Sequence, residues 1–365
     1  MRTPQNSRRR RSLPVRVLAL SVVGLLVLVG VSLGRALLAP GTDSTAARAA
    51  EWARAHGLSG VVDWAERTTY QAPAVGGGVK EDSPLAASPA KVLAGPARFG
   101  SIQPLASPPL PHEGEWQVLA TVAGRPALQV AYLRPDAVHT SYTAAVARMD
   151  TTLLKFVLHP GTQEPGGRPW KLPPVLTSSE RPSLLAAFNG GFRLDAARGG
   201  FLEQGRLAGR LRTGAASLVI STDGRATVGK WGSDVLPSAS VAAVRQNLDL
   251  IVDAGQVVPG LDNNAHGRWG RTLGNKLYVW RSGVGVASDG ALLYAAGNRL
   301  SASSLAELLR RAGSVRAMEL DINPEWTSFV TYPSPANLLP DMQRSPHRYD
   351  STSTRDFVAV LRRSA

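Results

Sequence analysis

A long apolar stretch near the N terminus restricts the fold of this chain more than any other feature. Val17 to Gly34 carries no charge and, as a helix rising about 1.5 Å per residue, would be about 27 Å long. Ala36 to Leu38 extend it past Arg35, whose side chain can reach the interface. Because the hydrocarbon core of a bilayer is about 30 Å thick, we expect residues 17–38 to form a transmembrane anchor.

The charges around this stretch predict its orientation. The first 35 residues contain seven arginines and no acidic residue. Cytoplasmic flanks of membrane helices are rich in Lys and Arg. We therefore expect residues 1–16 to be a basic cytoplasmic tip. The chain beyond the anchor is then the extracytoplasmic part of a single-pass protein of the cell membrane.

A cleaved signal peptide and a buried helix of a soluble core are the alternatives to an anchor. A small-x-small cleavage pattern occurs at Ala47 to Ala49, but it lies far from the apolar stretch. The stretch is also longer than the ~7–15 apolar residues typical of a signal peptide. An all-basic flank is unusual for a core helix. The sequence therefore favours an uncleaved anchor.

The strongly basic composition does not indicate nucleic-acid binding. The formal net charge is +14, from 41 basic and 27 acidic residues. Without the seven N-terminal arginines, 34 basic residues remain against 27 acids, a charge of +7. No dense basic run exists outside the tip, so we expect no nucleic-acid partner. The absence of cysteine excludes disulfides and thiolate catalysis.

Composition divides the chain beyond the anchor into three parts. Residues 39–70 contain two helix-forming stretches on either side of Gly57 and are predicted to be stalk helices. Residues 71–115 are rich in Pro, Gly, Ala and Ser, which is typical of a linker. In residues 116–365, short apolar runs of strand length predict one globular domain.

Turn and helix signals within this domain predict an α+β fold. Asp-Gly pairs ending at Gly224 and Gly290 each separate two apolar runs, which is the pattern of a β-hairpin. One helix is predicted from an N-cap at Ser301 or Ser303 to Gly313, and a strand follows it directly. We therefore expect a strand-rich single domain with a mixed sheet and a few helices.

Two segments place unusual residues at the ends of apolar strands. Asn189-Gly190-Gly191 follows one strand. Paired glycines allow positive φ and close approach of a ligand, and the amide can both donate and accept hydrogen bonds. An ordinary Asn-Gly turn is the alternative. Arg281 begins a glycine-containing strand, where a guanidinium could hold a phosphate or a carboxylate; a surface arginine is the alternative.

A third segment places acidic residues on a strand that otherwise has the composition of a core. Glu319, Asp321 and Asn323 share one face by the period of two, whereas Met318, Leu320 and Ile322 between them are apolar. Two carboxylates on one face suit acid–base or nucleophilic chemistry. A solvated edge strand is the alternative.

Together these segments resemble the phosphodiester glycosidase family. The family's Asn-Gly-Gly-Phe stretch is similar to residues 189–192, and its Arg-containing strand with an Asp-Gly hairpin is similar to residues 281–290. Its Leu-Asp strand is similar to Leu320-Asp321, and a closing Arg before a Val-Ala strand is matched by Arg355. Order and spacing agree from about residue 116 to 363.

The resemblance is incomplete after Asp321. There the family usually has three glycines, whereas this chain has Ile322-Asn323-Pro324. A glycine-rich turn lets a substrate lie against the backbone, and this tripeptide lacks that freedom. The resemblance therefore predicts the fold more strongly than the activity.

The resemblance implies a hydrolase that breaks the bond between the anomeric carbon of a sugar and a phosphodiester oxygen. Asp321 is the implied nucleophile or base, with Glu319 or Glu325 as a second carboxylate, and Arg281 would hold the phosphate. Asn189 completes the expected catalytic group and would position the sugar hydroxyls. The expected substrate-binding positions are Gly190, Gly191, Arg245, Asn247 and Asn323.

Two other functions remain compatible with the sequence. One is a non-catalytic envelope protein that binds a phosphate-bearing glycan, which loss of the glycine turn favours; the other is a structural partner of another membrane protein. The six histidines show no metal-site spacing, so we expect no metal and no cofactor. The expected partners are the membrane and a phosphate-bearing glycan.

Overall fold

A computed structural model describes residues 12–39, 44–68, 70–86, 100–166, 169–263, 267–270, 272 and 276–363. Five arginines of the predicted cytoplasmic tip, Arg2 and Arg8 to Arg11, lie outside the described residues. Three helices come first along the chain: α1 (Ser12–Leu37), α2 (Thr45–Ala55) and α3 (Ser59–Thr68). Helices are thus present in both segments where the sequence predicts them.

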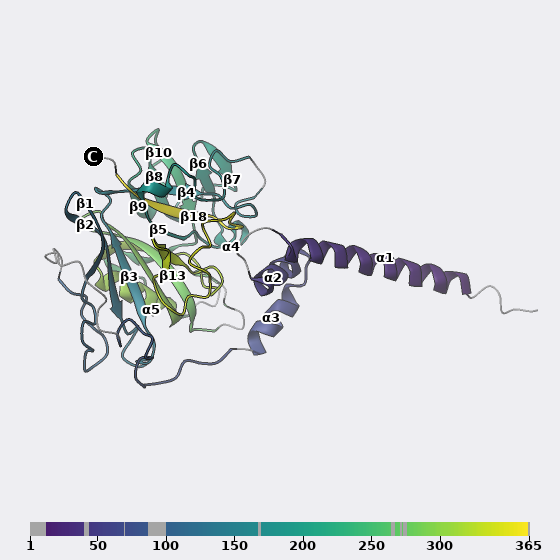
Figure 1. The fold of residues 1–365 in the computed structure, drawn as a ribbon, viewed down its shortest axis with the longest axis horizontal. Coiled ribbons are helices and arrows are strands. Elements are labelled where there is room, and N and C mark those ends of the chain that lie inside the picture. The colour runs from purple at the N-terminus through teal and green to yellow at the C-terminus, as the bar shows by residue number, and fades with distance from the viewer. Residues whose placement is uncertain are drawn as a thin grey trace, which may run out of the picture.

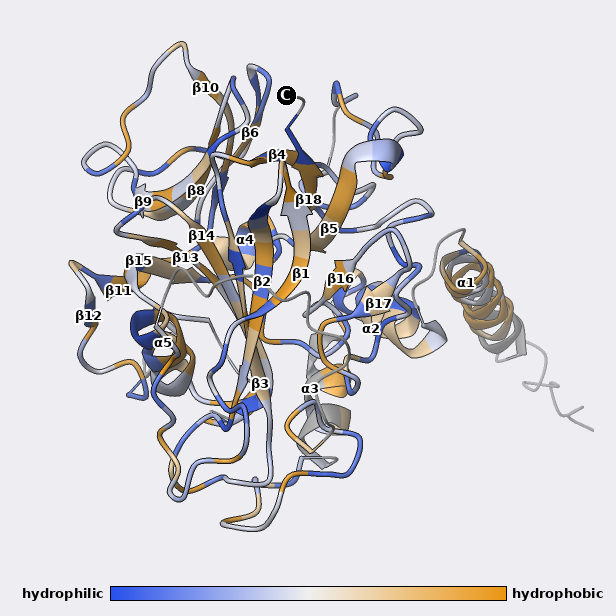
Figure 2. Cartoon of the chain, turned by 60° about the vertical axis from the view of Figure 1, so that its left-hand side comes forward, coloured by the Kyte–Doolittle hydropathy of each residue, from blue (hydrophilic) through white to orange (hydrophobic). Residues whose placement is uncertain are grey.

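Helix α1 projects away from the globular part of the molecule, with α2 and α3 at its base (Figure 1). Its segment Val17–Leu37 is long and apolar enough to cross a membrane or to act as a signal sequence, and none of its most apolar window is buried against the rest of the chain. Figure 2 shows hydrophobic residues along nearly all of this helix. Among the described residues, no other helix has this length and composition.

The globular part is built mainly from three antiparallel sheets. The first has eight strands in the order β1-β2-β3-β14-β13-β15-β11-β12, the second five in the order β7-β6-β10-β8-β9, and the third five in the order β17-β16-β5-β18-β4. The strands of the first sheet are β1 (Gln117–Val122), β2 (Arg125–Leu133), β3 (Ala144–Met149), β14 (Leu292–Leu300), β13 (Val279–Ala287), β15 (Ser314–Glu319), β11 (Leu250–Asp253) and β12 (Gln256–Val257).

The other two sheets are smaller and lie against the first. The second sheet consists of β7 (Arg206–Ala208), β6 (Phe201–Glu203), β10 (Val241–Gln246), β8 (Ala216–Ser221) and β9 (Ala226–Lys230). The third consists of β17 (Ala336–Asn337), β16 (Phe329–Thr331), β5 (Leu184–Asn189), β18 (Phe357–Arg362) and β4 (Leu154–His159).

The strand-rich α+β class is confirmed, but the expected mixed sheet is wrong. Every pairing between named strands is antiparallel. Both Asp-Gly hairpins form, β8 with β9 and β13 with β14. Gly224 and Gly290 there have φ of 80° and 83°, which only glycine adopts easily. Some antiparallel pairs are joined by hairpin turns, and others, such as β3 with β14, join strands far apart in the sequence.

Helix α5 (Ala302–Arg311) forms where the sequence predicts a helix, and it packs on one face of the eight-stranded sheet. Ser301 caps its N terminus in a capping box with Ser304. The helix lies close to β13, since a Cβ on Gly283 would lie 3.1 Å from the side chains of Leu305 and Leu309. The glycine at 283 is therefore explained by packing of α5, with no ligand required.

Part of the segment predicted as a linker is packed on the domain. Ile102 is 2% exposed and belongs to the core cluster that contains α5. Glu113 makes a buried ion pair with Arg134 at 2.8 Å. Because proline and glycine suit irregular but ordered backbone as well as flexible linkers, composition did not reveal this packing.

Candidate active site

Asn189 lies at the end of β5, where the third sheet meets the first. Its amide nitrogen donates to the Ser282 hydroxyl at 3.1 Å and to the Gly190 carbonyl at 2.8 Å. Its amide oxygen accepts from the Tyr294 hydroxyl at 3.0 Å and from the Ser328 backbone at 3.1 Å. All the donors and acceptors of this buried amide are thus used within the protein.

The two glycines after Asn189 are required by close packing. Neither has a positive φ. A Cβ on Gly190 would lie 2.0 Å from a carboxylate oxygen of Asp356, and one on Gly191 would lie 3.1 Å from the Arg245 guanidinium carbon. The close approach that two glycines predicted is therefore made by the chain's own side chains.

Arg245 and Asn247 support this segment from β10 and the residues after it. Arg245 is fully buried and forms an ion pair with Asp356 at 2.8 Å. Asn247 accepts from the Phe192 backbone at 3.2 Å and donates to the Glu319 carbonyl at 2.6 Å. Both side chains hold neighbouring strands in position, although the sequence suggested that they contact substrate.

Arg281 and Glu319 point to a different face of the sheet. Arg281 follows the alternation of β13, so its side chain lies opposite that of Ser282, which contacts Asn189. It donates to Glu319 at 2.5 Å, to the Leu300 carbonyl at 2.9 Å and to the Leu277 carbonyl at 3.2 Å. Burial raises the pKa of Glu319, and the attraction of Arg281 opposes this. The charge of Asp321 also raises the pKa of Glu319.

Asp321 follows β15 and is joined to Asn189 through Ser282. The Asp321 backbone donates to the Ser282 hydroxyl at 3.2 Å, and the Ser282 backbone donates to the Asp321 carbonyl at 2.8 Å. The Asp321 carboxyl is buried, and one of its oxygens accepts from the backbone of Ile322 at 2.8 Å and of Asn323 at 3.0 Å. Burial raises its pKa to about 6, although a neighbouring arginine, Arg355, lowers it.

Arg355 is the cation beside Asp321, and it was not among the expected site residues. It lies just before β18, its Nη2 is 3.4 Å from the Asp321 carboxylate, and its guanidinium stands 4.9 Å from the Trp326 ring centre. Its buried Nε and Nη1 have no hydrogen-bond partner among the described residues. The motif match at residue 355 was the one sequence signal that could have identified it.

Asn323 and Glu325 form the turn that stands where the family has glycines. The Asn323 side chain accepts from the Glu325 backbone at 2.9 Å, and its carbonyl accepts from the Trp326 backbone at 3.0 Å. The Glu325 carboxylate accepts from the Ser44 hydroxyl at 3.0 Å and faces Arg344 at 3.4 Å. The turn therefore places the Glu325 carboxylate next to Ser44, the N-cap residue of α2.

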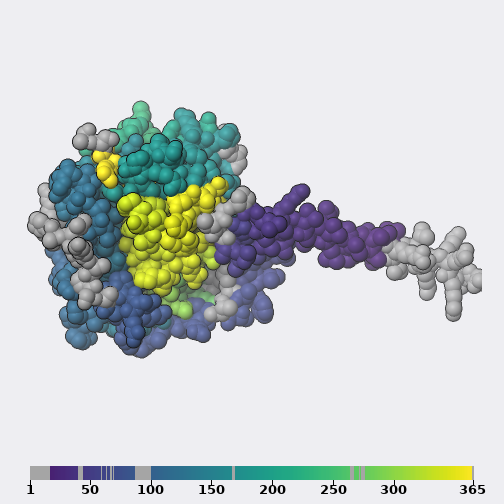
Figure 3. Space-filling view, in the orientation of Figure 1, coloured from purple at the N-terminus to yellow at the C-terminus, as the bar shows by residue number. Residues whose placement is uncertain are grey.

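Helix α2 covers the Arg355 side of this cluster, and Figure 3 shows the N-terminal helices against the C-terminal region. Glu51 of α2 accepts from Arg193 at 2.7 Å, and its other oxygen lies 3.9 Å from Arg355 Nη1. Arg193 also faces Glu164 at 3.4 Å. Burial raises the pKa of Glu164. None of these three was singled out in the sequence, because residues 51, 164 and 193 meet only through the tertiary fold.

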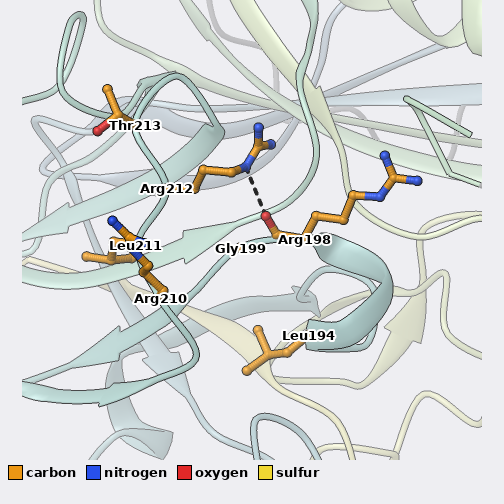
Figure 4. Close-up of a pocket in the computed structure, with 7 residues that line it drawn as sticks. All are labelled: Leu194, Arg198, Gly199, Arg210, Leu211, Arg212 and Thr213. Atoms are coloured by element: carbon orange, nitrogen blue, oxygen red, sulfur yellow. Dashed lines mark hydrogen bonds between the residues drawn. The ribbon is translucent and has the colours of Figure 1, made fainter. Parts of the chain in front are cut away.

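A surface pocket of about 570 Å³ lies beside the short helix α4 (Leu194–Ala197), which follows Arg193 (Figure 4). Arg193 is the N-cap of α4, and Arg198, which lines the pocket, follows the last residue of that helix. Two of the lining residues are hydrogen-bonded, since the Arg212 guanidinium donates to the Arg198 carbonyl at 3.0 Å. Leu194, the first residue of α4, also lines the pocket, so the pocket borders this short helix at both ends.

No protein-family profile and no curated protein matches this sequence. Among solved structures, the chain is similar to the zebrafish N-acetylglucosamine-1-phosphodiester alpha-N-acetylglucosaminidase catalytic domain, auto-inhibited by its pro-peptide. The identity is 15%, the coverage 68% of this chain and 88% of that one, and the TM-score 0.46.

Two further solved structures are similar. One is a hypothetical protein from Synechocystis, with 13% identity, 67% and 63% coverage and a TM-score of 0.38. The other is a putative exported protein from Burkholderia pseudomallei, with 14% identity, 62% and 75% coverage and a TM-score of 0.37. At these values, none of the three likenesses assigns an activity or a residue role to this chain.

We expect Asp356→Asn to destabilise the protein by about 3–5 kcal/mol, because it leaves the buried Arg245 guanidinium without its counter-charge. Chemical denaturation of the full-length protein in detergent measures this change. Asp350→Asn is the control, since its pair with Arg181 is partly exposed and should contribute only about 0–1 kcal/mol. Equal effects of the two substitutions would contradict the structural role of Arg245.

Proposed function

We propose that this protein is a membrane-anchored, extracytoplasmic hydrolase of a sugar-1-phosphodiester of cell-envelope glycans, with Asp321 and Arg355 at its reactive centre. One observation supports this most: a buried carboxyl with a pKa of about 6 lies beside a buried guanidinium whose Nε and Nη1 have no hydrogen-bond partner among the described residues. Groups with such perturbed environments concentrate at functional sites. The motif resemblance over residues 116–363 supports the same reaction class.

In this proposal Arg355 takes the phosphate-binding role that the sequence suggested for Arg281. The donors of Arg281 already bind Glu319 and two carbonyls, whereas Arg355 retains donors without partners. A guanidinium in a dry site stabilises charge that develops on a departing phosphate oxygen. A phosphate ester is a good leaving group, so this site needs less general-acid help than an ordinary glycosidase.

Asp321 would act at the anomeric carbon, either as the nucleophile or as the base for a water molecule. With a pKa of about 6 it is mostly ionised at neutral pH, as either role requires. Glu164 and Glu325 are the candidates for a second carboxylate, because Glu319 is paired with Arg281 on the other face of the sheet. Asn189 would position Asp321 through Ser282.

Binding of a phosphate-bearing glycan without turnover is the second candidate. The turn from Ile322 to Trp326 favours it, because its backbone amides already bind the Asp321 carboxylate and the Asn323 side chain. A glycine turn would leave more backbone open to a substrate. This candidate predicts saturable glycan binding and no released sugar.

We expect Asp321→Asn to abolish sugar release from a panel of sugar-1-phosphodiesters, by at least about 10²-fold in kcat, because the amide can act neither as nucleophile nor as base. Product analysis of the full-length protein in detergent measures the rate. Asp350→Asn is the control, since that residue lies in a surface pair. Full activity of Asp321→Asn would refute the assignment, and inactivity of the unmodified protein on the whole panel would favour the binding function.

The pH dependence of the reaction should report the Asp321 carboxyl. Burial raises its pKa to about 6, so the reactive, ionised form is lost as the pH falls below about 6. We expect kcat/KM to rise as the pH increases from 5 to 7. A flat profile over this range, or one that falls with increasing pH, would contradict a role for ionised Asp321.

A further inference from the structure

Glu51 brings a carboxylate into the candidate site from outside the globular domain. It accepts from Arg193 at 2.7 Å and lies 3.9 Å from Arg355 Nη1, and its side chain is only 11% exposed. Helix α2, which carries it, is also joined to α1, where the Trp52 indole donates to the Ser32 hydroxyl at 3.0 Å. A single acidic side chain of the membrane-proximal region thus lies between two arginines of the domain.

The hydrogen bonding of Arg355 is incomplete with Glu51 in this position. Of its five N–H donors, only Nη2 makes a hydrogen bond among the described residues, a long one to Asp321 at 3.4 Å. Nε and Nη1 are buried and make none, since 3.9 Å to Glu51 is too long. A buried donor without an acceptor costs free energy. The geometry therefore calls for an acceptor that extends further than a carboxylate.

Phosphate oxygens have that reach. A phosphodiester offers two charged oxygens on a tetrahedral centre, and arginine binds phosphate with two parallel hydrogen bonds. Placed where the Glu51 carboxylate lies, such a group can accept from Arg193 and, with an oxygen that extends further, from Nη1 of Arg355. The Trp326 ring lies 4.9 Å from the Arg355 guanidinium carbon.

We propose that Arg193 and Arg355 form the binding site for a phosphodiester group, and that the Glu51 carboxylate occupies this site until the ligand displaces α2. The proposal rests on the proposed function for the identity of the ligand. It adds the two residues that bind the phosphate and an internal competitor for them. The ligand and Glu51 exclude each other, because both are anions that need the same donors.

The weak attachment of α2 makes this displacement feasible. Ala47 is the only buried residue of the helix. Its contacts with the domain include the Glu51 pairs, and its N-cap Ser44 donates to Glu325 at 3.0 Å. Because α2 has one buried residue, its release leaves the core of the domain closed, and the polar contacts of Glu51 and Ser44 are part of the cost of opening.

Removal of the Glu51 charge tests the proposal. Full-length protein in detergent is titrated with dimethyl phosphate, a phosphodiester without a sugar, and binding is followed by 31P NMR. We expect Glu51→Gln to bind this probe about tenfold more tightly than the unmodified protein, and Arg355→Gln or Arg193→Gln added to it to remove the gain. Thermal melting confirms folding, and Glu51→Ala serves as a second variant with the same expectation.

Glu307→Gln is the matched control, because Glu307 is also a helical glutamate paired with two arginines, Arg310 and Arg311, at 2.7 and 2.9 Å. It should leave affinity for the probe unchanged. Equal affinity of Glu51→Gln and the unmodified protein, or equal gains from Glu51→Gln and Glu307→Gln, would overturn the proposal. Tighter binding by Glu51→Gln without any sugar release would keep the phosphate site and refute the hydrolase. Sugar release by the unmodified protein, with no change in probe affinity on Glu51→Gln, would keep the hydrolase and refute competition by Glu51.

Discussion

The junction at Asn189 holds the rest of the site in place. This one amide uses its nitrogen and its oxygen to connect the end of β5 with Ser282 on β13, Tyr294 on β14 and the backbone of Ser328. Ser282 in turn binds the backbone of Asp321. A buried amide group without a hydrogen-bond partner costs free energy, so these hydrogen bonds fix how the third sheet lies against the first. The position of the Asp321 carboxyl follows from that arrangement.

Local signals in the sequence were sufficient for most of the fold. The hairpin turns at Gly224 and Gly290 and the capped helix after Ser301 depend on a few neighbouring residues, and all three form as predicted. The antiparallel character of the sheets depends on which strands become neighbours. The alternation of side chains along a strand relates only residues of that strand. It therefore did not show which strands pair with one another.

The candidate site was only partly predictable for the same reason. Asn189 and Asp321 were found because each follows an apolar strand, and the structure joins them through Ser282. Arg281 was expected beside them, but strand alternation sends it to the opposite face. Arg355 and Glu51 come from distant parts of the chain, and nothing near either in sequence indicates that they meet.

In the proposed reaction the bond from the anomeric carbon to oxygen breaks, and the phosphorus–oxygen bonds stay intact. Hydrolysis of a sugar-1-phosphodiester in H₂¹⁸O, followed by mass spectrometry of both products, measures this directly. Attack at carbon, assisted by Asp321 with the phosphate held by Arg355, predicts ¹⁸O in the released sugar and none in the phosphate. Label in the phosphate would show attack at phosphorus and would contradict the account.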